Sequence, residues 1–307
     1  MTANTIPIYH PLSGLYEPSA IQQLADGRFL VVEDEKQRPF SLVSINHDGS
    51  VSSAALTPGL LKGGDSFWKL NDLEGLTADR SGNIYAITSH SRADDGEQKK
   101  SRDKLVRFRI EGESVLAARV FTGLKAALLA MHPVLAAAAE IKDVKTGGGL
   151  NIEALEIRPD QQCLLIGLRS PLLEHRAIIA CVENLAEMFD ADQPPRVCDT
   201  LQTLDLGGNG IRGLAYFACL DGYLLIAGPV AREPLQFQIW FWSGQPGAPA
   251  RAVSVPGLPG FARAEGICPA LIDGRQHIVI VNDDGSREEA RFARFLLLDP
   301  EQLQIAP

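Results

Sequence analysis

One pattern of polar and apolar positions occurs five times along the 307-residue chain. Each copy opens with a charged residue beside a small one, followed by an apolar run, a polar turn and a second apolar run. The second copy, for example, consists of Asp72–Leu76, Ser81–Asn83 and Ile84–His90. The Gly and Asn residues in such turns accept positive φ, so each copy is typical of a β-hairpin. The charged residues that mark the five copies are Glu17, Glu74, Glu153, Arg212 and Glu265.

A third apolar run follows each hairpin, and a fourth precedes the next copy in four of the five repeats. The last copy lacks its fourth run, but a matching run at residues 6–10 lies before the first copy. A β-propeller closes its ring in this way, with one blade completed from the other end of the chain. We therefore expect an all-β propeller of about five four-stranded blades, closed by the N-terminal strand. A sixth blade hidden in the longest interval, 74–153, is the alternative.

Two segments interrupt the repeats. Residues 91–104 form a charged loop after the second run of copy two, and residues 124–149 form an insertion that begins with an Ala- and Leu-rich stretch. That stretch has high helix propensity, and Pro133 should end or kink the helix. No Pro- or Ser-rich linker divides the chain. We expect one propeller domain over residues 1–307 with one helical insertion.

Antiparallel pairing brings the polar ends of these strands together. The start of a blade's first strand lies beside the end of its second strand, and the first strands line the central channel. The five marked residues should therefore meet the second-strand ends around one mouth of the channel. The residues expected there from the second strands are Glu33, Asp34, Ser89, His90, Arg169, Asp283 and Asp284, and Asp72 should accompany Glu74.

Four carboxylates around one channel repel each other unless a cation intervenes. Ca²⁺ and Mg²⁺ prefer carboxylate oxygens, so we predict that one of these ions is held by Glu17, Glu74, Glu153 and Glu265. His90 titrates near neutral pH and joins Glu74 and Glu153 as a candidate catalytic residue. The candidate contacts to an anionic substrate are Arg169, Arg212, Asp34 and Asp284. The alternative is a solvated polar channel without chemistry.

Composition narrows the partners. The chain has 29 basic and 38 acidic residues and a net charge of −9, which argues against nucleic acid. No apolar stretch approaches the length that crosses a bilayer, and residues 1–7 lack the pattern of a signal peptide. We expect a cytoplasmic protein with no membrane partner. The sequence leaves the oligomeric state open.

Two further patterns predict absences. The five cysteines include no C-x-x-C pair, which argues against a disulfide framework or a zinc site and favours a role in the core. Gly208–Gly213 matches G-x-G-x-x-G, but a strand follows it where a dinucleotide site requires a helix. We therefore expect no nucleotide cofactor.

The motifs Asp72–Leu76, Asn151–Leu155, Ile166–Pro171 and Ala264–Ile267 resemble those of a family of uncharacterised bacterial propellers related to esterase-like phytase domains. The resemblance implies a propeller and, by analogy, an ester or phosphoester hydrolase. More distantly, the Glu-Gly motifs resemble calcium-dependent lactonase and gluconolactonase-type propellers, in which a channel-strand Glu holds the metal. Glu17, Glu74 and Glu265 would match that Glu, whereas Arg212 departs from the pattern.

These observations lead to two hypotheses. The first is a metal-assisted hydrolase of a small anionic ester, phosphoester or lactone, with its site at the channel mouth. The second is a non-catalytic propeller that binds a ligand or a protein at the same mouth. The sequence leaves open whether the protein is an enzyme and which substrate it would act on.

Overall fold

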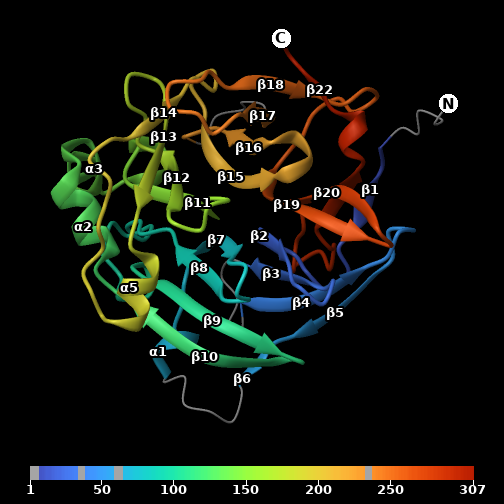
Figure 1. Cartoon of the computed structure of the whole chain (residues 1–307), viewed down its shortest axis with the longest axis horizontal. Helices are drawn as coiled ribbons and strands as arrows, with labels where there is room; N and C mark the ends of the chain where they lie inside the picture. Colours follow the sequence, from blue (N-terminus) through green and yellow to red (C-terminus); the bar gives the residue numbers. More distant parts are fainter. Residues whose placement is uncertain (1–6, 34–38, 59–64, 232–236) are drawn as a thin grey trace.

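Five sheets, each built on four antiparallel strands, form a ring in which the first strand of every sheet faces the centre (Figure 1). The computed structural model describes residues 7–33, 39–58, 65–231 and 237–307. Blade 1 contains β2 (Pro18–Gln23), β3 (Phe29–Glu33), β4 (Phe40–Ile45) and β5 (Val51–Ala55). Blade 2 contains β7 (Leu73–Ala78), β8 (Ile84–Thr88), β9 (Leu105–Glu111) and β10 (Ser114–Phe121), with the short β6 (Thr57–Pro58) at its edge.

The other three blades follow in chain order. Blade 3 contains β11 (Asn151–Ile157), β12 (Leu164–Ser170), β13 (Ala177–Val182) and β14 (Gln202–Leu204). Blade 4 contains β15 (Gly210–Phe217), β16 (Gly222–Gly228), β17 (Gln238–Trp242) and β18 (Arg251–Ser254), extended by β22 (Gln304–Ile305). Blade 5 contains β19 (Ala264–Ile272), β20 (Arg275–Asn282), β21 (Arg294–Leu298) and β1 (Tyr9–Pro11).

The N-terminal strand closes the ring, as predicted. Strand β1 pairs antiparallel with β21, with Tyr9 opposite Leu296, and so becomes the outermost strand of the last blade. The six-blade alternative is wrong, because the long interval between copies two and three holds helices and not a further blade. The Ala-rich insertion forms α2 (Leu124–Met131) and α3 (Pro133–Ala139), which meet at Pro133, followed by the short α4 (Val144–Gly147).

The remaining helices are short. Helix α1 (Asp65–Trp68) precedes blade 2, and α5 (Leu185–Asp190) lies between β13 and β14. Single 3₁₀ turns occur at Lys100–Arg102, Ala218–Leu220 and Pro300–Gln302. Within the described part of the chain, no helix has both the length and the apolar character needed to cross a membrane.

Tight packing of neighbouring first strands explains the small residue of each repeat. A Cβ added to Gly75 would lie 2.8 Å from Cβ of Leu155, on the next blade. One added to Gly266 of blade 5 would lie 2.9 Å from Cα of Ala20 on blade 1, the next blade around the ring. Larger side chains there would push the blades apart, so the motif of a charged residue followed by Gly or Ala is a requirement of ring closure.

Candidate active site

Each of the five first strands has an irregularity at the same place. In each blade the register between first and second strands leaves out one residue of the first strand, which is a β-bulge, and in blade 3 it also leaves out Arg169 of the second strand. A bulge leaves one residue out of the ladder and re-aims its side chain. We call these residues the bulge ring; they are Ser19, Glu74, Glu153, Arg212 and Glu265.

Blade 1 corrects one prediction. Glu17, which the sequence placed in the same position as the other marked residues, lies two residues before the bulge, and Ser19 occupies the equivalent place. Asp72, Asn151 and Arg263 lie at the corresponding position in their own blades, two residues before the bulge. The bulge residues and residues two positions before them together line one cavity of about 580 Å³. This volume lies within the range of about 300–1,000 Å³ that is usual for small-molecule sites.

The bulge ring is the floor of this cavity. Below it the channel narrows to a space of about 10 Å³, where the apolar residues of the first strands fill the centre. The cavity therefore opens on one face of the propeller. The two insertions reach that side, because Arg92 and Asp94 of the charged loop and Val144 of α4 line the cavity. Arg92 Nε also donates to the carbonyl oxygen of Ala139, at the end of α3, at 2.9 Å.

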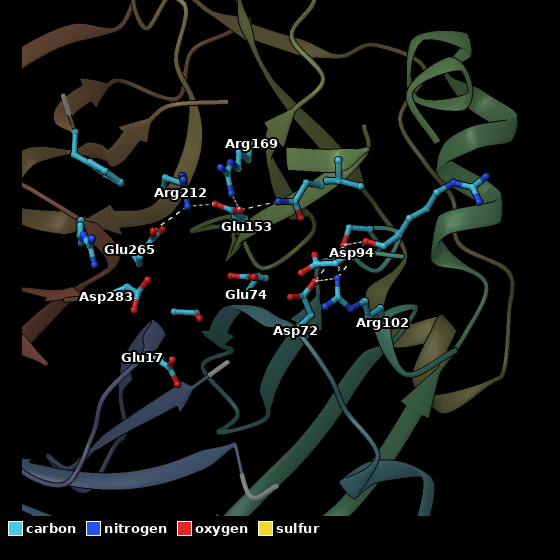
Figure 2. Close-up of a pocket in the computed structure, with 17 residues that line it drawn as sticks. Glu17, Asp72, Glu74, Asp94, Arg102, Glu153, Arg169, Arg212, Glu265 and Asp283 are labelled. Carbon is cyan, nitrogen blue, oxygen red and sulfur yellow. Dashed lines mark hydrogen bonds and ion pairs between the residues drawn. The ribbon is translucent and has the colours of Figure 1, made fainter. Parts of the chain in front are cut away.

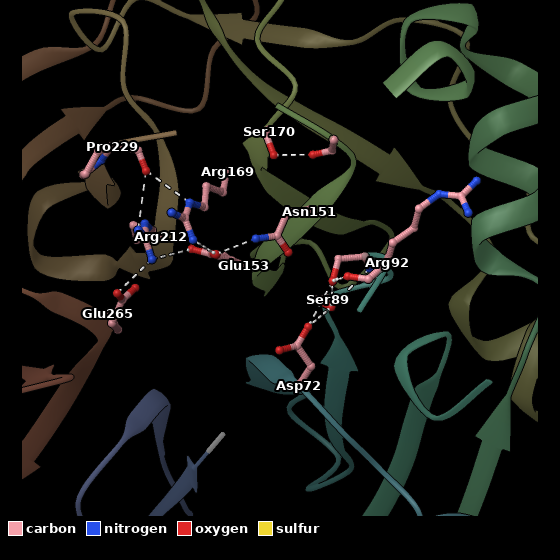
Figure 3. A network of polar contacts seen from close by, with 12 residues as sticks. Asp72, Ser89, Arg92, Asn151, Glu153, Arg169, Ser170, Arg212, Pro229 and Glu265 are labelled. Atoms are coloured by element: carbon pink, nitrogen blue, oxygen red, sulfur yellow. Dashed lines mark hydrogen bonds and ion pairs between the residues drawn. The ribbon is translucent and has the colours of Figure 1, made fainter. Parts of the chain in front are cut away.

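Two arginines bind the carboxylates of blades 3 and 5 (Figures 2 and 3). Glu153 accepts from Arg169 Nη1 at 3.1 Å and lies 3.0 Å from Arg212 Nη1. The same Arg212 nitrogen donates to Glu265 Oε1 at 2.8 Å. Arg169 and Arg212 also donate to the carbonyl oxygen of Pro229, at 3.1 and 3.4 Å. Arg169 and Arg212, predicted to lie near these acids, thus form one continuous network with them.

The acids of this cavity have unequal proton affinities. Burial raises the pKa of Glu265 to about 8; Arg212 opposes the shift, while Glu153 and Asp283 add to it. Burial also raises the pKa of Asp283. Burial alone would lower the pKa of Arg212, but its carboxylate neighbours raise it. Glu265 therefore binds a proton more tightly than an ordinary carboxyl, beside a guanidinium that stays charged.

Asp72, at the wall of the cavity, is fixed by several donors. Its Oδ2 accepts from Ser91 Oγ at 3.1 Å and from Ser89 Oγ, and it forms an ion pair with Arg102, whose Nη1 lies 3.1 Å away (Figures 2 and 3). Arg102 is held in turn by Asn71 Oδ1, 2.8 Å from its Nε. The Asp72 side chain is 12% exposed, so it is a rigid hydrogen-bond acceptor at the cavity. The sequence offered one signal for this role, its position just ahead of the Glu74 bulge.

The structure does not bring His90 to the cavity, contrary to the sequence-based placement at the mouth. Its φ of 56° turns the side chain into the protein, where it is fully buried. Its Nδ1 lies 2.7 Å from the carbonyl oxygen of Thr88, and its Nε2 lies 3.4 Å from Asp103 Oδ1. Burial lowers the pKa of His90. A direct role in proton transfer to a ligand in the cavity therefore lacks geometric support.

Neither of the predicted substrate contacts of blades 1 and 5, Asp34 and Asp284, is among the described residues that line the cavity. Asp284 is not one of the described residues that line the cavity, because its carboxylate accepts from Arg294 N at 2.9 Å and Arg294 Nε at 2.6 Å. Its neighbour Asp283 lines the cavity instead. Asp34 lies outside the described residues. Glu17 lines the cavity near its rim and accepts from Arg287 Nε at 3.1 Å.

The four predicted metal ligands do not converge on one point. Among the described residues, no group of three or more His, Cys, Asp or Glu side chains is arranged to hold a metal ion. Oxygens of Glu153 and Glu265 contact guanidinium groups instead. Ca²⁺ requires six to eight oxygen ligands, so this arrangement does not fit it without rearrangement. The Ca²⁺ or Mg²⁺ site stays a prediction.

The fold is shared with solved structures of low sequence identity. One is a GH43_1 enzyme from Xanthomonas citri, with a TM-score of 0.51, 12% identity and coverage of 98% of this chain and 93% of that chain. Another is a mutant of the Bombyx mori GH32 β-fructofuranosidase BmSUC1 in complex with sucrose, with a TM-score of 0.53, 10% identity and coverage of 98% of this chain and 65% of that chain. At these identities the likeness shows the fold alone.

A comparison with curated proteins found no match. A protein-family model does match, over residues 126–297, which is more than half of the chain. The matched part runs from the helical insertion through the strands of blades 3, 4 and 5. The chain therefore belongs to the DUF3616 family, described as proteins of unknown function.

Proposed function

We propose that this protein is a hydrolase that cleaves a small anionic ester, phosphoester or lactone in the central cavity. Glu265 is the general acid and Glu74 the general base. The proposal rests on the burial of Glu265 in the cavity, where its side chain is 12% exposed and its pKa is raised to about 8. A carboxyl group that keeps its proton at neutral pH is suited to protonate a leaving group.

The remaining ring residues support this division of roles. Glu74 points into the cavity from the bulge of blade 2, and its charge interacts with that of Arg212 (Figure 2). In the proposed reaction a water molecule attacks the scissile carbon or phosphorus and gives a proton to Glu74. Glu265 gives its proton to the leaving oxygen as the ester bond breaks. Transfer of the proton from Glu74 back to Glu265 through water restores the starting state.

The lining residues favour a small, polar, anionic substrate. The described part of the cavity has seven carboxylates and five arginines. Burial raises the pKa of both Glu265 and Asp283, which reduces the negative charge that an anionic ligand would meet in the cavity. Arg263, two residues before the bulge of blade 5, is exposed and lines the cavity. We assign it to bind the anionic group of the substrate. The motif resemblance to esterase-like phytase domains supports an ester or phosphoester as the scissile group.

A non-catalytic binding propeller is the second candidate. The observation that favours it is the pairing of Glu153 with two arginines, which stabilises the ring without leaving that carboxylate for chemistry. In this case the cavity would bind an anion and release it unchanged.

Turnover assays separate the two candidates. The purified protein is assayed against p-nitrophenyl butyrate, p-nitrophenyl phosphate, small lactones and aryl glycosides, with and without a chelator. For a substrate that is cleaved, Glu265→Gln should lower kcat/KM by about 100-fold or more, since general acids contribute about 10²–10⁴-fold. Glu156→Gln is the matched control, because Glu156 is a carboxyl with its pKa also raised to about 8 that does not belong to the described lining.

Three results would change or exclude parts of this proposal. Binding of sulfate or phosphate with no turnover of any substrate would favour the binding propeller. Loss of activity in the chelator, together with Ca²⁺ or Mg²⁺ binding by calorimetry that Glu74→Gln weakens, would restore the metal-assisted version. Equal activity of Glu265→Gln and the parent would exclude Glu265 as the acid.

A further inference from the structure

Three of the five cysteines lie together on one face of blade 3. Cys181 on β13 is opposite Leu165 on β12, and Cys163 precedes Leu165 by two residues. Side chains two residues apart in extended chain point to the same face, so Cys163 and Cys181 share one. On the other side of β13, Val182 bridges Val197, and Cys198 N donates to the carbonyl oxygen of Cys181 at 2.9 Å. Cys181 and Cys198 are therefore directly opposed.

The geometry of this pair suits a covalent link. The strand pairing sets Cys198 beside Cys181, with Cys163 on the same face. Directly opposed residues in a hydrogen-bonded antiparallel pair have Cα atoms about 5.5 Å apart, near the centre of the range that disulfides span. Both Cys181 and Cys198 are partly exposed, whereas Cys163 is buried. Small oxidants can therefore reach the opposed pair.

We propose that Cys181 and Cys198 form a reversible disulfide that reacts with small disulfides such as oxidised glutathione. The bond would close the segment 182–197, which contains α5. This segment joins two blades, because Phe189 of α5 packs on Tyr85 and Asp190 pairs with Arg107 of blade 2. Oxidation would thus fix the connection between blades 2 and 3. This inference is independent of the proposed hydrolase activity.

The exchange balances without a further reactant. The thiolate of Cys198 attacks one sulfur of glutathione disulfide, forming a mixed disulfide and releasing one glutathione. The thiolate of Cys181 then attacks the Cys198 sulfur, forming the protein disulfide and releasing a second glutathione. The two cysteines lose two electrons and two protons, and glutathione disulfide gains them. Burial raises the pKa of both Cys181 and Cys198, so the exchange should be slow at neutral pH and accelerate as pH rises.

The test is a mass-spectrometric map of the folded protein after incubation with oxidised glutathione at about pH 8.5. The background carries Cys219→Ser, because Cys219 is exposed and would form a mixed disulfide of its own. We expect a linked pair of peptides containing Cys181 and Cys198, a loss of two free thiols, and reversal by dithiothreitol. The melting temperature should rise by a few degrees, because closing a loop of this length constrains the unfolded chain.

Variants make the result specific. Cys198→Ser and Cys181→Ser should each abolish the link, whereas Cys163→Ser should leave it intact. Circular dichroism checks that each variant is folded before oxidation. A Cys163–Cys181 link, a stable glutathione adduct on Cys198 without a cross-link, or four intact thiols in the folded Cys219→Ser protein would each overturn the proposal.

Discussion

Arg212 of blade 4 donates to Glu265 of the neighbouring blade 5, with 2.8 Å between Nη1 and Oε1. The same guanidinium lies 3.0 Å from Glu153 of blade 3. One buried cation therefore joins the bulge residues of three consecutive blades. It replaces the acid that the repeat pattern places in the other copies, and it lets two carboxylates share the floor of the cavity.

Removing this cation should destabilise the protein. Arg212→Ala leaves Glu153, whose side chain is 3% exposed, and Glu265 without their shared partner. Breaking a buried ion pair by deleting one partner costs about 3–5 kcal/mol. We expect a loss of about 3 kcal/mol in the free energy of unfolding, measured by urea denaturation. Arg196→Ala is the control, since Arg196 is 58% exposed in its ion pairs and should lose less than about 1 kcal/mol. Equal losses in the two variants would contradict this account of the ring.

Ring closure makes a second prediction about stability. An alanine at position 75 would place its Cβ 2.8 Å from Ile87 Cγ2 and from Leu155 Cβ. Both neighbours belong to packed strands, so Gly75→Ala should cost about 1–3 kcal/mol by overpacking. Gly260→Ala, which meets no atom within 4 Å, should be nearly neutral. Thermal melts of the two variants compare them directly, and a neutral Gly75→Ala would mean that the first strands are less tightly packed than the structure indicates.

The fold and part of the site follow from the sequence because propeller symmetry carries equal repeat positions onto a ring. Glu74, Glu153, Arg212 and Glu265 were predicted to face one mouth on that argument, and all four occupy bulges there. Glu17 was misplaced because the copies were aligned on charged residues, and the bulge of blade 1 is occupied by the uncharged Ser19. Only the register between β2 and β3 identifies Ser19 as the bulge.

Other features depend on local geometry that composition does not encode. The positive φ of His90 turns its side chain away from the cavity. Nothing in the polar residues beside it in the sequence predicts this conformation. The cysteine cluster requires the segment before β14 to return beside β13, which the spacing of the cysteines along the chain does not indicate. Spacing along the chain therefore favoured isolated core cysteines, whereas the pairing of strands brings three together.

Glu156 gives a prediction for the pH dependence of stability. Burial raises its pKa to about 8, against hydrogen bonds from Tyr216 N at 3.4 Å and Thr77 Oγ1 at 3.2 Å. Between about pH 4.5 and 8 the folded protein keeps a proton that the unfolded chain releases. Glu156 therefore makes its full contribution to the free energy of unfolding below about pH 4.5, and this contribution is lost as pH rises through 8.

Glu156→Gln removes that titration. The free energy of unfolding of the parent should fall between pH 5 and pH 8, and the fall should be smaller in Glu156→Gln by at least about 1 kcal/mol. Urea denaturation at several pH values measures it. Glu301→Gln, at an exposed position near the C-terminus, should keep the parent's slope. An unchanged slope in Glu156→Gln would show that this carboxyl is ionised in the folded state.

The protonation of Glu265 should control anion binding in the cavity. Sulfate is the suitable probe, because its charge stays constant from pH 6 to pH 9.5. As pH rises through about 8, Glu265 ionises and adds a negative charge beside Glu153 and Asp283. The arginines keep their charge over this range. Sulfate affinity should therefore fall by about tenfold between pH 7 and pH 9, which corresponds to about 1.4 kcal/mol of added repulsion.

In Glu265→Gln the side chain stays neutral, so its sulfate affinity should change little with pH and should exceed the parent's at pH 9. Glu156→Gln should follow the parent, since that carboxyl does not belong to the described lining of the cavity. Calorimetric titration gives each affinity directly. A parent and a Glu265→Gln variant with the same pH profile would mean that another group, Asp283 first among them, carries the titrating proton.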